Sequence, residues 1–158
     1  MKVHEVMTKN AETLLPTDSV RIAAKRLAAR GVGGMPVVDN AGSLKGVLTE
    51  FDILEAMKTQ HKRLKMLMPP EISFGISFVE ILEEREAAKA FEEIGDRAVG
   101  DVMSKDVAWV AVDETVERAI QLMVNKKVHR LPVVDHGKVV GVVTRGDILR
   151  GFFRSLPE

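Results

Sequence analysis

Hydrophobic and polar positions follow the same order twice along the chain. A helical spacing of apolar residues at i, i+3, i+4 and i+7 occurs at Val20, Ala23, Ala24 and Leu27, and again at Val116, Ala119, Ile120 and Met123. Each helical stretch is followed by an apolar run, "MPVVD" or "LPVVD", then by a short polar turn and a second apolar run. These runs predict two strands joined as a hairpin. A shorter helical stretch follows each hairpin, so each copy is predicted to be β-α-β-β-α.

The two copies align over most of their length. A shift of 96 residues places Met7 on Met103, and a shift of 95, after one residue is lost in the turn, places Asp52 on Asp147. One copy buries too little surface to be stable alone, so we expect both to pack with pseudo-two-fold symmetry as one α+β module. The predicted segments are repeat one at 1–57, a helical insert or linker at 58–98, and repeat two at 99–158.

Local signals predict where the elements begin and end. Short apolar strands are expected at "ETLL" (12–15) and "AWVAV" (108–112). The caps of the two longer helices are expected at Asp18–Ser19 and at 113–115, and Gly31 is expected to end the first helix. Trp109, in the expected strand of repeat two, is interpreted as a core residue or the wall of a cleft.

Composition narrows the function classes. The 158 residues include 23 basic and 23 acidic side chains, a balance that disfavours a nucleic-acid-binding protein. No apolar run approaches the roughly 18 residues of a membrane span, and "MKVHEVMTKN" lacks the apolar core of a signal peptide, so a cytoplasmic location is expected. The absence of cysteine excludes disulfides and thiolate chemistry. Histidines without metal-ligand spacing and the lack of catalytic motifs predict neither a metal site nor an enzyme.

A Thr-x-x-Asp sequence opens the second helix of each repeat, at Thr49–Asp52 and Thr144–Asp147. One interpretation is a capping box, in which the hydroxyl and the carboxylate bond the first backbone amides of the helix. The other is ligand binding, because a helix N-terminus attracts phosphate and a carboxylate accepts ribose hydroxyls. The two interpretations are compatible.

The repeats differ just before the "PVVD" strand. Repeat two carries His129 and Arg130 where repeat one carries Gly33 and Gly34. Basic side chains at a strand edge are usually only solvated. Arginine, however, forms bidentate bonds with phosphate, and histidine adds a donor near neutral pH, so this pair is a candidate phosphate-binding site.

The doubled sequence "x-PVVD-x-x-G-x-x-x-G-x-x-T-x-x-D-I-L" resembles the cystathionine β-synthase (CBS) domain, of which two in tandem form a Bateman module. "VHRLPVVD" is similar to the γ subunit of AMP-activated protein kinase, in which the matching His and Arg reach nucleotide phosphates. The resemblance implies a regulatory, non-enzymatic module that binds AMP, ADP or ATP between the repeats. NAD and S-adenosylmethionine are further candidates. It also implies that the Thr and the Asp contact phosphate and ribose.

The resemblance assigns two groups of binding residues, each drawn from both repeats. The favoured group consists of Met103, Ala108, Val128, His129, Arg130, Thr49 and Asp52. The second group consists of Met7, Glu12, Val32, Gly33, Gly34, Thr144, Arg145 and Asp147. The first is favoured because His129 and Arg130 supply two basic side chains, whereas the second has only Arg145 as a candidate cation.

The insert combines a basic run, "KTQHKRLKMLMPP", with an acidic amphipathic helix. The apolar residues of that helix are Phe78, Ile81, Ala88 and Phe91. This helix is expected either to cap the module or to form a dimer or partner surface.

Together with the sequence, the resemblance to the CBS family implies a sensor that binds an adenine nucleotide, forms a homodimer, and modulates a partner or its own assembly. The alternative is a ligand-free interaction module that acts on an enzyme or transporter. Both hypotheses stay open at this point, as do the identity of the nucleotide and of the partner.

Overall fold

The computed structural model describes residues 1–60 and 84–156, and the predictions for 61–83 lie outside this range. The chain forms a mixed α+β structure of two compact units. Neither unit coincides with one repeat. Unit 1 comprises Met1–Thr13, Pro36–Gly46 and Lys105–Glu158, and unit 2 comprises Leu14–Met35 and Val47–Ser104.

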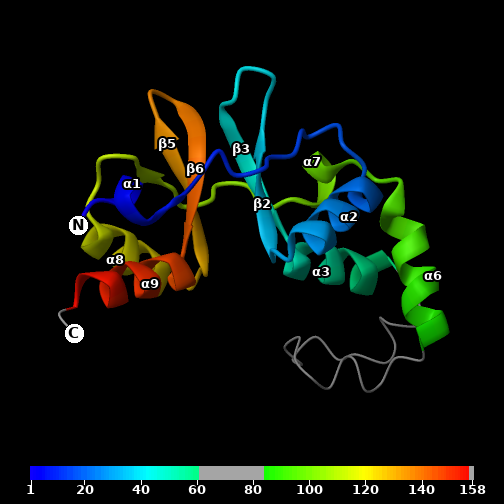
Figure 1. Cartoon of the computed structure of the whole chain (residues 1–158). Coiled ribbons are helices and arrows are strands. Elements are labelled where there is room, and N and C mark those ends of the chain that lie inside the picture. The colour runs from blue at the N-terminus through cyan, green and yellow to red at the C-terminus, as the bar shows by residue number, and fades with distance from the viewer. Residues whose placement is uncertain (61–83, 157–158) are drawn as a thin grey trace. The chain divides into compact units, whose positions relative to one another are not determined.

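Unit 1 is built on a sheet with the strand order β1-β6-β5-β4. Its strands are β1 (Thr8–Lys9), β4 (Val110–Ala111), β5 (Arg130–Asp135) and β6 (Lys138–Thr144). β5 and β6 form the predicted antiparallel hairpin, β1 adds antiparallel to β6, and β4 adds parallel to β5. Helices α8 (Val116–Lys126) and α9 (Arg145–Ser155) pack against β5 and β6, and the short α1 (Val3–Val6) contacts α9 (Figure 1).

The core of unit 1 joins residues from both ends of the chain. Val3, from α1, is fully buried among residues that all belong to repeat two. The other members of this core are Val110, Val116, Ala119, Met123, Leu131, Val133, Val143 and Ile148. The N-terminal residues of repeat one therefore complete the hydrophobic core of repeat two.

Unit 2 is mainly helical, with the base of a second hairpin. It contains α2 (Val20–Arg30), α3 (Glu50–Gln60), α6 (Glu84–Gly95) and α7 (Val99–Val102), and parts of β2 (Gly34–Val38) and β3 (Leu44–Thr49). Helix α6 packs along α3 and α2, as Figure 1 also shows. In the described part of the insert, α6 therefore covers the α2–α3 face of unit 2. Its expected role, as a cap of the module or as a dimer or partner surface, stays a prediction.

The face that α6 buries differs from the prediction. Ala90 and Ile94, one turn apart, are fully buried, whereas Ala88 is exposed and Phe91 is half-buried. Phe78 and Ile81 lie outside the described residues. The prediction followed the bulkiest side chains, but the small Ala90 lets α6 approach its neighbours closely, and this decides which face turns inward.

The leading segment of each repeat, residues 3–9 in repeat one and 99–104 in repeat two, pairs with the hairpin of the other repeat, so the two segments are exchanged. In unit 1, Thr8 of repeat one pairs with Val142 of repeat two. In unit 2, Ser104, the counterpart of Thr8, forms an antiparallel bridge with Val47, with both N–H···O bonds at 3.0 Å. Gly141 permits the approach in unit 1, because a Cβ at this position would collide with the carbonyl oxygen of Thr8.

The strands expected before the two longer helices are shorter than predicted. No strand covers 12–15: the N–H of Leu15 donates to the Asp18 carboxylate at 2.8 Å instead of to a neighbouring strand. Only Val110 and Ala111 of the expected 108–112 form a strand. Trp109 is 52% exposed and lines a hollow of unit 1 together with Ala111 and Val134, so of its two interpretations the core residue is wrong and the cleft wall is confirmed.

The helix ends agree with the sequence analysis. The hydroxyls of Ser19 and Thr115 accept the N–H groups of Ile22 and Arg118, each at 3.2 Å. Gly31 ends α2 in the left-handed conformation, with φ of 62°. Within 1–60 and 84–156, none of the helices combines the length and apolarity that crossing a bilayer requires.

We predict that Val3→Ala and Val99→Ala, one in each exchanged segment, each destabilise the protein by roughly 1–3 kcal/mol, because both valines are fully buried. The control is Ile22→Val on α2, where the side chain is 46% exposed and a loss below about 0.5 kcal/mol is expected. Urea denaturation measures all three variants. Equal stabilities of Val3→Ala and Ile22→Val would show that the leading segment adds nothing to the core.

Candidate functional site

In unit 1, Thr144 and Asp147 form a reciprocal capping box at the start of α9. The Thr144 N–H and hydroxyl both donate to Oδ2 of Asp147 at 2.8 Å, and the Asp147 N–H donates to the Thr144 hydroxyl oxygen at 3.2 Å. Asp147 is only 7% exposed. The capping interpretation is therefore confirmed here.

In unit 2, Thr49 and Asp52 form the same three bonds, at 2.9, 3.0 and 3.2 Å. The difference lies in the second carboxylate oxygen. Oδ1 of Asp52 accepts the hydroxyl of Ser104 at 2.7 Å, whereas Oδ1 of Asp147 accepts the guanidinium of Arg150 at 2.6 Å. The same box therefore has a neutral partner in one unit and a cationic partner in the other.

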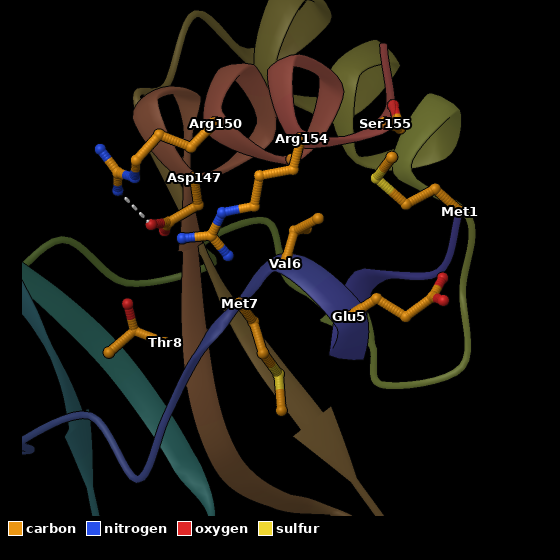
Figure 2. Close-up of a pocket in the computed structure, with 10 residues that line it drawn as sticks. Met1, Glu5, Val6, Met7, Thr8, Asp147, Arg150, Arg154 and Ser155 are labelled. Carbon is orange, nitrogen blue, oxygen red and sulfur yellow. Dashed lines mark hydrogen bonds and ion pairs between the residues drawn. The ribbon is translucent and has the colours of Figure 1, made fainter. Parts of the chain in front are cut away.

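A hollow of about 470 Å³ lies beside Asp147 in unit 1. Its walls come from the N-terminal segment and from α9, as Figure 2 shows. The lining residues are Met1, Glu5, Val6, Met7, Thr8, Asp147, Arg150, Gly151, Arg154 and Ser155. Two members of the second predicted group, Met7 and Asp147, therefore face the same hollow.

Arg150, Arg154 and Glu5 are the charged residues of this hollow that the sequence analysis missed. It named only Arg145 as a cation for this group, but Arg145 lines a different groove, between α8 and α9. The available signal was helical spacing: positions three and seven after Asp147 lie on its side of the helix. In Figure 2 both arginine side chains extend from α9 on the side of Asp147.

Glu5 supplies the other carboxylate of the hollow. The backbone N–H of Lys2 bonds this carboxylate and lowers the pKa of Glu5, so Glu5 is ionised at neutral pH. The lining therefore offers two guanidinium groups, two carboxylates and the apolar side chains of Val6 and Met7. This mixture suits a ligand that has an anionic part, hydroxyl groups and an apolar part.

The remaining predicted residues of unit 1 lie near the start of β5 or before β4. His129 is exposed, and its carbonyl oxygen accepts the Arg145 N–H at 3.2 Å. Arg130 begins β5, is half-buried and is paired in register with Thr144. Ala108 and Val128 are half-buried against the core of unit 1.

The remaining predicted residues of unit 2 act mainly through their backbone, in hydrogen bonds or at the start of a strand. Met103 follows α7 and donates its N–H to Val99 at 2.8 Å. The Gly33 carbonyl accepts the Glu50 N–H at 3.0 Å, Gly34 begins β2, and Val32 is 37% exposed. Glu12, assigned to unit 1, is half-buried.

Both predicted binding groups draw residues from both units. Arg130 belongs to unit 1 and Asp52 to unit 2, for example. The structure brings together Met7, Thr144 and Asp147 of the second group, on unit 1. The combinations that span the units remain predictions.

Comparison with known proteins agrees with the repeat. The family model "CBS domain" matches residues 3–59 and 99–154. The uncharacterized protein MJ1426 of Methanocaldococcus jannaschii is 32% identical over 120 residues, which cover 75% of this chain and 71% of that protein. The chloroplastic protein CBSX2 of Arabidopsis thaliana is 30% identical over 145 residues, which cover 90% of this chain but only 58% of CBSX2.

The fold comparison agrees with the sequence comparison. A crystal structure of CBSX2 in complex with AMP has a TM-score of 0.69 and 28% identity, covering 97% of this chain and 96% of that one. Two family matches, related sequences and a shared fold lead to the same conclusion: the chain belongs to the CBS domain family.

Proposed function

We propose that this protein is a regulatory CBS pair that senses an adenine nucleotide, with AMP, ADP or ATP as the ligand. One observation carries the proposal: CBSX2, which shares the fold over nearly the whole chain, was crystallised with AMP. NAD and S-adenosylmethionine remain alternative ligands. The role is regulatory and not catalytic.

The geometry of each capping box suits such a ligand. The N-terminus of α9 is the positive end of the helix dipole, which favours phosphate, and the Thr144 hydroxyl, which donates to Asp147 at 2.8 Å, would turn to donate to a ligand. Asp147, one turn into the helix, presents a carboxylate that accepts ribose hydroxyls. Capping holds both groups in place before a ligand arrives, which lowers the entropy lost on binding.

For the principal phosphate site we keep the group favoured by the sequence, in which His129 and Arg130 act with Thr49 and Asp52. Its support is the chemistry of the side chains, since Arg130 can bind phosphate oxygens in a bidentate manner. Occupancy regulates the protein only if its two conformations bind the nucleotide with different affinities.

Assembly as a homodimer is part of the proposal, and the α8–α9 face is the surface we assign to it. In unit 2 the equivalent α2–α3 face is covered by α6, and Met57 there is only 6% exposed. The counterpart of Met57 in unit 1, Phe152, is 37% exposed, and its neighbours Leu149 and Phe153 are 57% and 72% exposed. An apolar face of this kind, repeated in a second copy, can bury itself across a two-fold axis.

The same exposed face supports the alternative function, a ligand-free module that docks on an enzyme or transporter. Such a module would use the α8–α9 face without any nucleotide.

The first prediction concerns the ligand. Thermal unfolding with AMP, ADP, ATP, NAD or S-adenosylmethionine at a hundredfold the dissociation constant should show a stabilisation of about 2.7 kcal/mol, or roughly 5 °C or more, for one of them. Arg130→Ala should abolish most of this shift. No shift with any of the five would favour the ligand-free alternative.

The second prediction compares the two boxes. Asp52→Ala and Arg130→Ala should each weaken nucleotide binding in calorimetry more than Asp147→Ala does. The reason is that Asp52 and Arg130 belong to the favoured binding group, whereas Asp147 belongs to the second group. Both aspartates also cap helices, so Asp52→Ala and Asp147→Ala should each lose about 1 kcal/mol of stability. Thermal unfolding without ligand measures this loss separately. Equal losses of affinity in all three variants would contradict the asymmetry.

The third prediction concerns assembly. Leu149→Lys and Phe153→Lys should shift the protein from dimer to monomer in sedimentation equilibrium, because a lysine pair across the axis would place like charges in an apolar interface. Phe51→Lys, at a 56% exposed site on α3 of unit 2, is the control and should leave the dimer intact. A monomeric parent protein would overturn the dimer and leave this face to a different partner.

A further inference from the structure

We propose that the hollow on unit 1 binds nucleotides that carry a phosphate on the 2′- or 3′-hydroxyl of the ribose, and that Arg150 and Arg154 hold this phosphate. The proposal rests on the adenine-nucleotide function above and names the ligand class for one site. All the residues that it uses belong to unit 1.

The order of groups along α9 carries the argument. Thr144 caps the helix, and Asp147, Arg150 and Arg154 follow at helical spacing along the side that faces the hollow (Figure 2). With a rise of about 1.5 Å per residue, Arg150 lies about 4.5 Å and Arg154 about 10 Å beyond Asp147 along the axis. A nucleotide with its 5′-phosphate at the helix N-terminus and its ribose at Asp147 therefore has the arginines on its far side, beside the 2′- and 3′-oxygens.

Of the four charged side chains of the hollow, Glu5 would repel a phosphate, whereas the charges at Asp147 permit one beside the arginines. Oδ2 of Asp147 is occupied by the Thr144 N–H and hydroxyl, and the Arg150 guanidinium at 2.6 Å from Oδ1 neutralises the carboxylate. Arg150 is 64% exposed in its side chain and so has further N–H donors available to a ligand. In dinucleotide folds, likewise, an acidic residue binds the free 2′-hydroxyl and a nearby arginine accommodates the 2′-phosphate.

Arg154 supplies a second guanidinium. Among residues 1–60 and 84–156, the structure shows no hydrogen bond or ion pair of its side chain, although it lines the hollow. Arg150 and Arg154 are four residues apart and so adjacent on the helix surface, where like charges repel. A phosphate between them would relieve this repulsion and accept charge-assisted bonds from both.

The second copy of the motif provides an internal comparison. The counterparts of Arg150 and Arg154 on α3 are Glu55 and Thr59, found by the same shift of 95 residues. Thr59 donates its hydroxyl to the Ala56 carbonyl at 3.1 Å, and the Asp52 carboxylate has the neutral Ser104 in place of an arginine. The box of unit 2 would therefore repel a second phosphate and accept a ribose with free hydroxyls.

The test is isothermal titration calorimetry on the intact chain with AMP, ADP, adenosine 3′,5′-bisphosphate and adenosine 2′,5′-bisphosphate. One bisphosphate should bind at least about tenfold more tightly than AMP, the effect expected of one added charge-assisted contact. Arg154→Thr, which installs the residue of the other copy, should lower the ratio of bisphosphate to AMP affinity about tenfold. Arg118→Thr, on α8 and outside the hollow, is the matched control and should keep that ratio.

The outcomes separate this inference from the proposed function. Binding of AMP with no preference for either bisphosphate would overturn the inference and leave the nucleotide-sensing function in place. A preference for ADP that Arg154→Thr removes would show that the arginines serve the 5′-chain, which also overturns it. Failure of all four nucleotides to bind would overturn the inference and exclude AMP and ADP as ligands of the proposed function, which would then depend on ATP, NAD or S-adenosylmethionine in the thermal-unfolding test. Arg154→Thr carries the test because Arg150 also stabilises buried Asp147, and its loss affects folding.

Discussion

The exchange of the leading segments is the constraint on which the rest of the structure depends. Thr8 pairs with Val142 and Ser104 with Val47, so each hairpin receives a segment from the other repeat. Val3 fills the core that repeat two leaves incomplete. A single repeat would lack both the edge pairing and the buried valine, and for this reason the fold needs the duplication.

The same exchange decides what surrounds each capping box. It places Ser104 against Asp52 in unit 2, and it brings Met7 to the hollow beside Asp147 in unit 1. The surroundings of each aspartate are thus shared between the two repeats, and substitutions in either repeat can change them. The two repeats have diverged at this point: Asp147 of unit 1 has Arg150 as its partner, whereas Asp52 of unit 2 has the Ser104 hydroxyl.

The sequence predicted the features that depend on near neighbours. Capping at Ser19, the left-handed Gly31 and both Thr-x-x-Asp boxes follow from contacts within a few residues, and all are present. The exchange joins Thr8 to a strand more than a hundred residues away, and hydrophobic periodicity contains no information about such pairing. The buried face of α6 depended in the same way on close packing at Ala90, whereas the Arg150–Asp147 pair, three residues apart, was predictable but missed.

Helix α9 connects the candidate site to the exposed surface. Ile148 anchors it in the core of unit 1, Asp147 and Arg150 face the hollow, and Leu149 and Phe153 lie on the exposed apolar side. In the proposed sensor, the Asp147 carboxylate that caps this helix is also the group that a ribose would contact, so binding would act directly on the helix start. A displacement there would move the helix and alter its exposed side. Ligand occupancy and surface recognition can therefore be coupled within eleven residues, provided the two positions of α9 differ in affinity for the nucleotide.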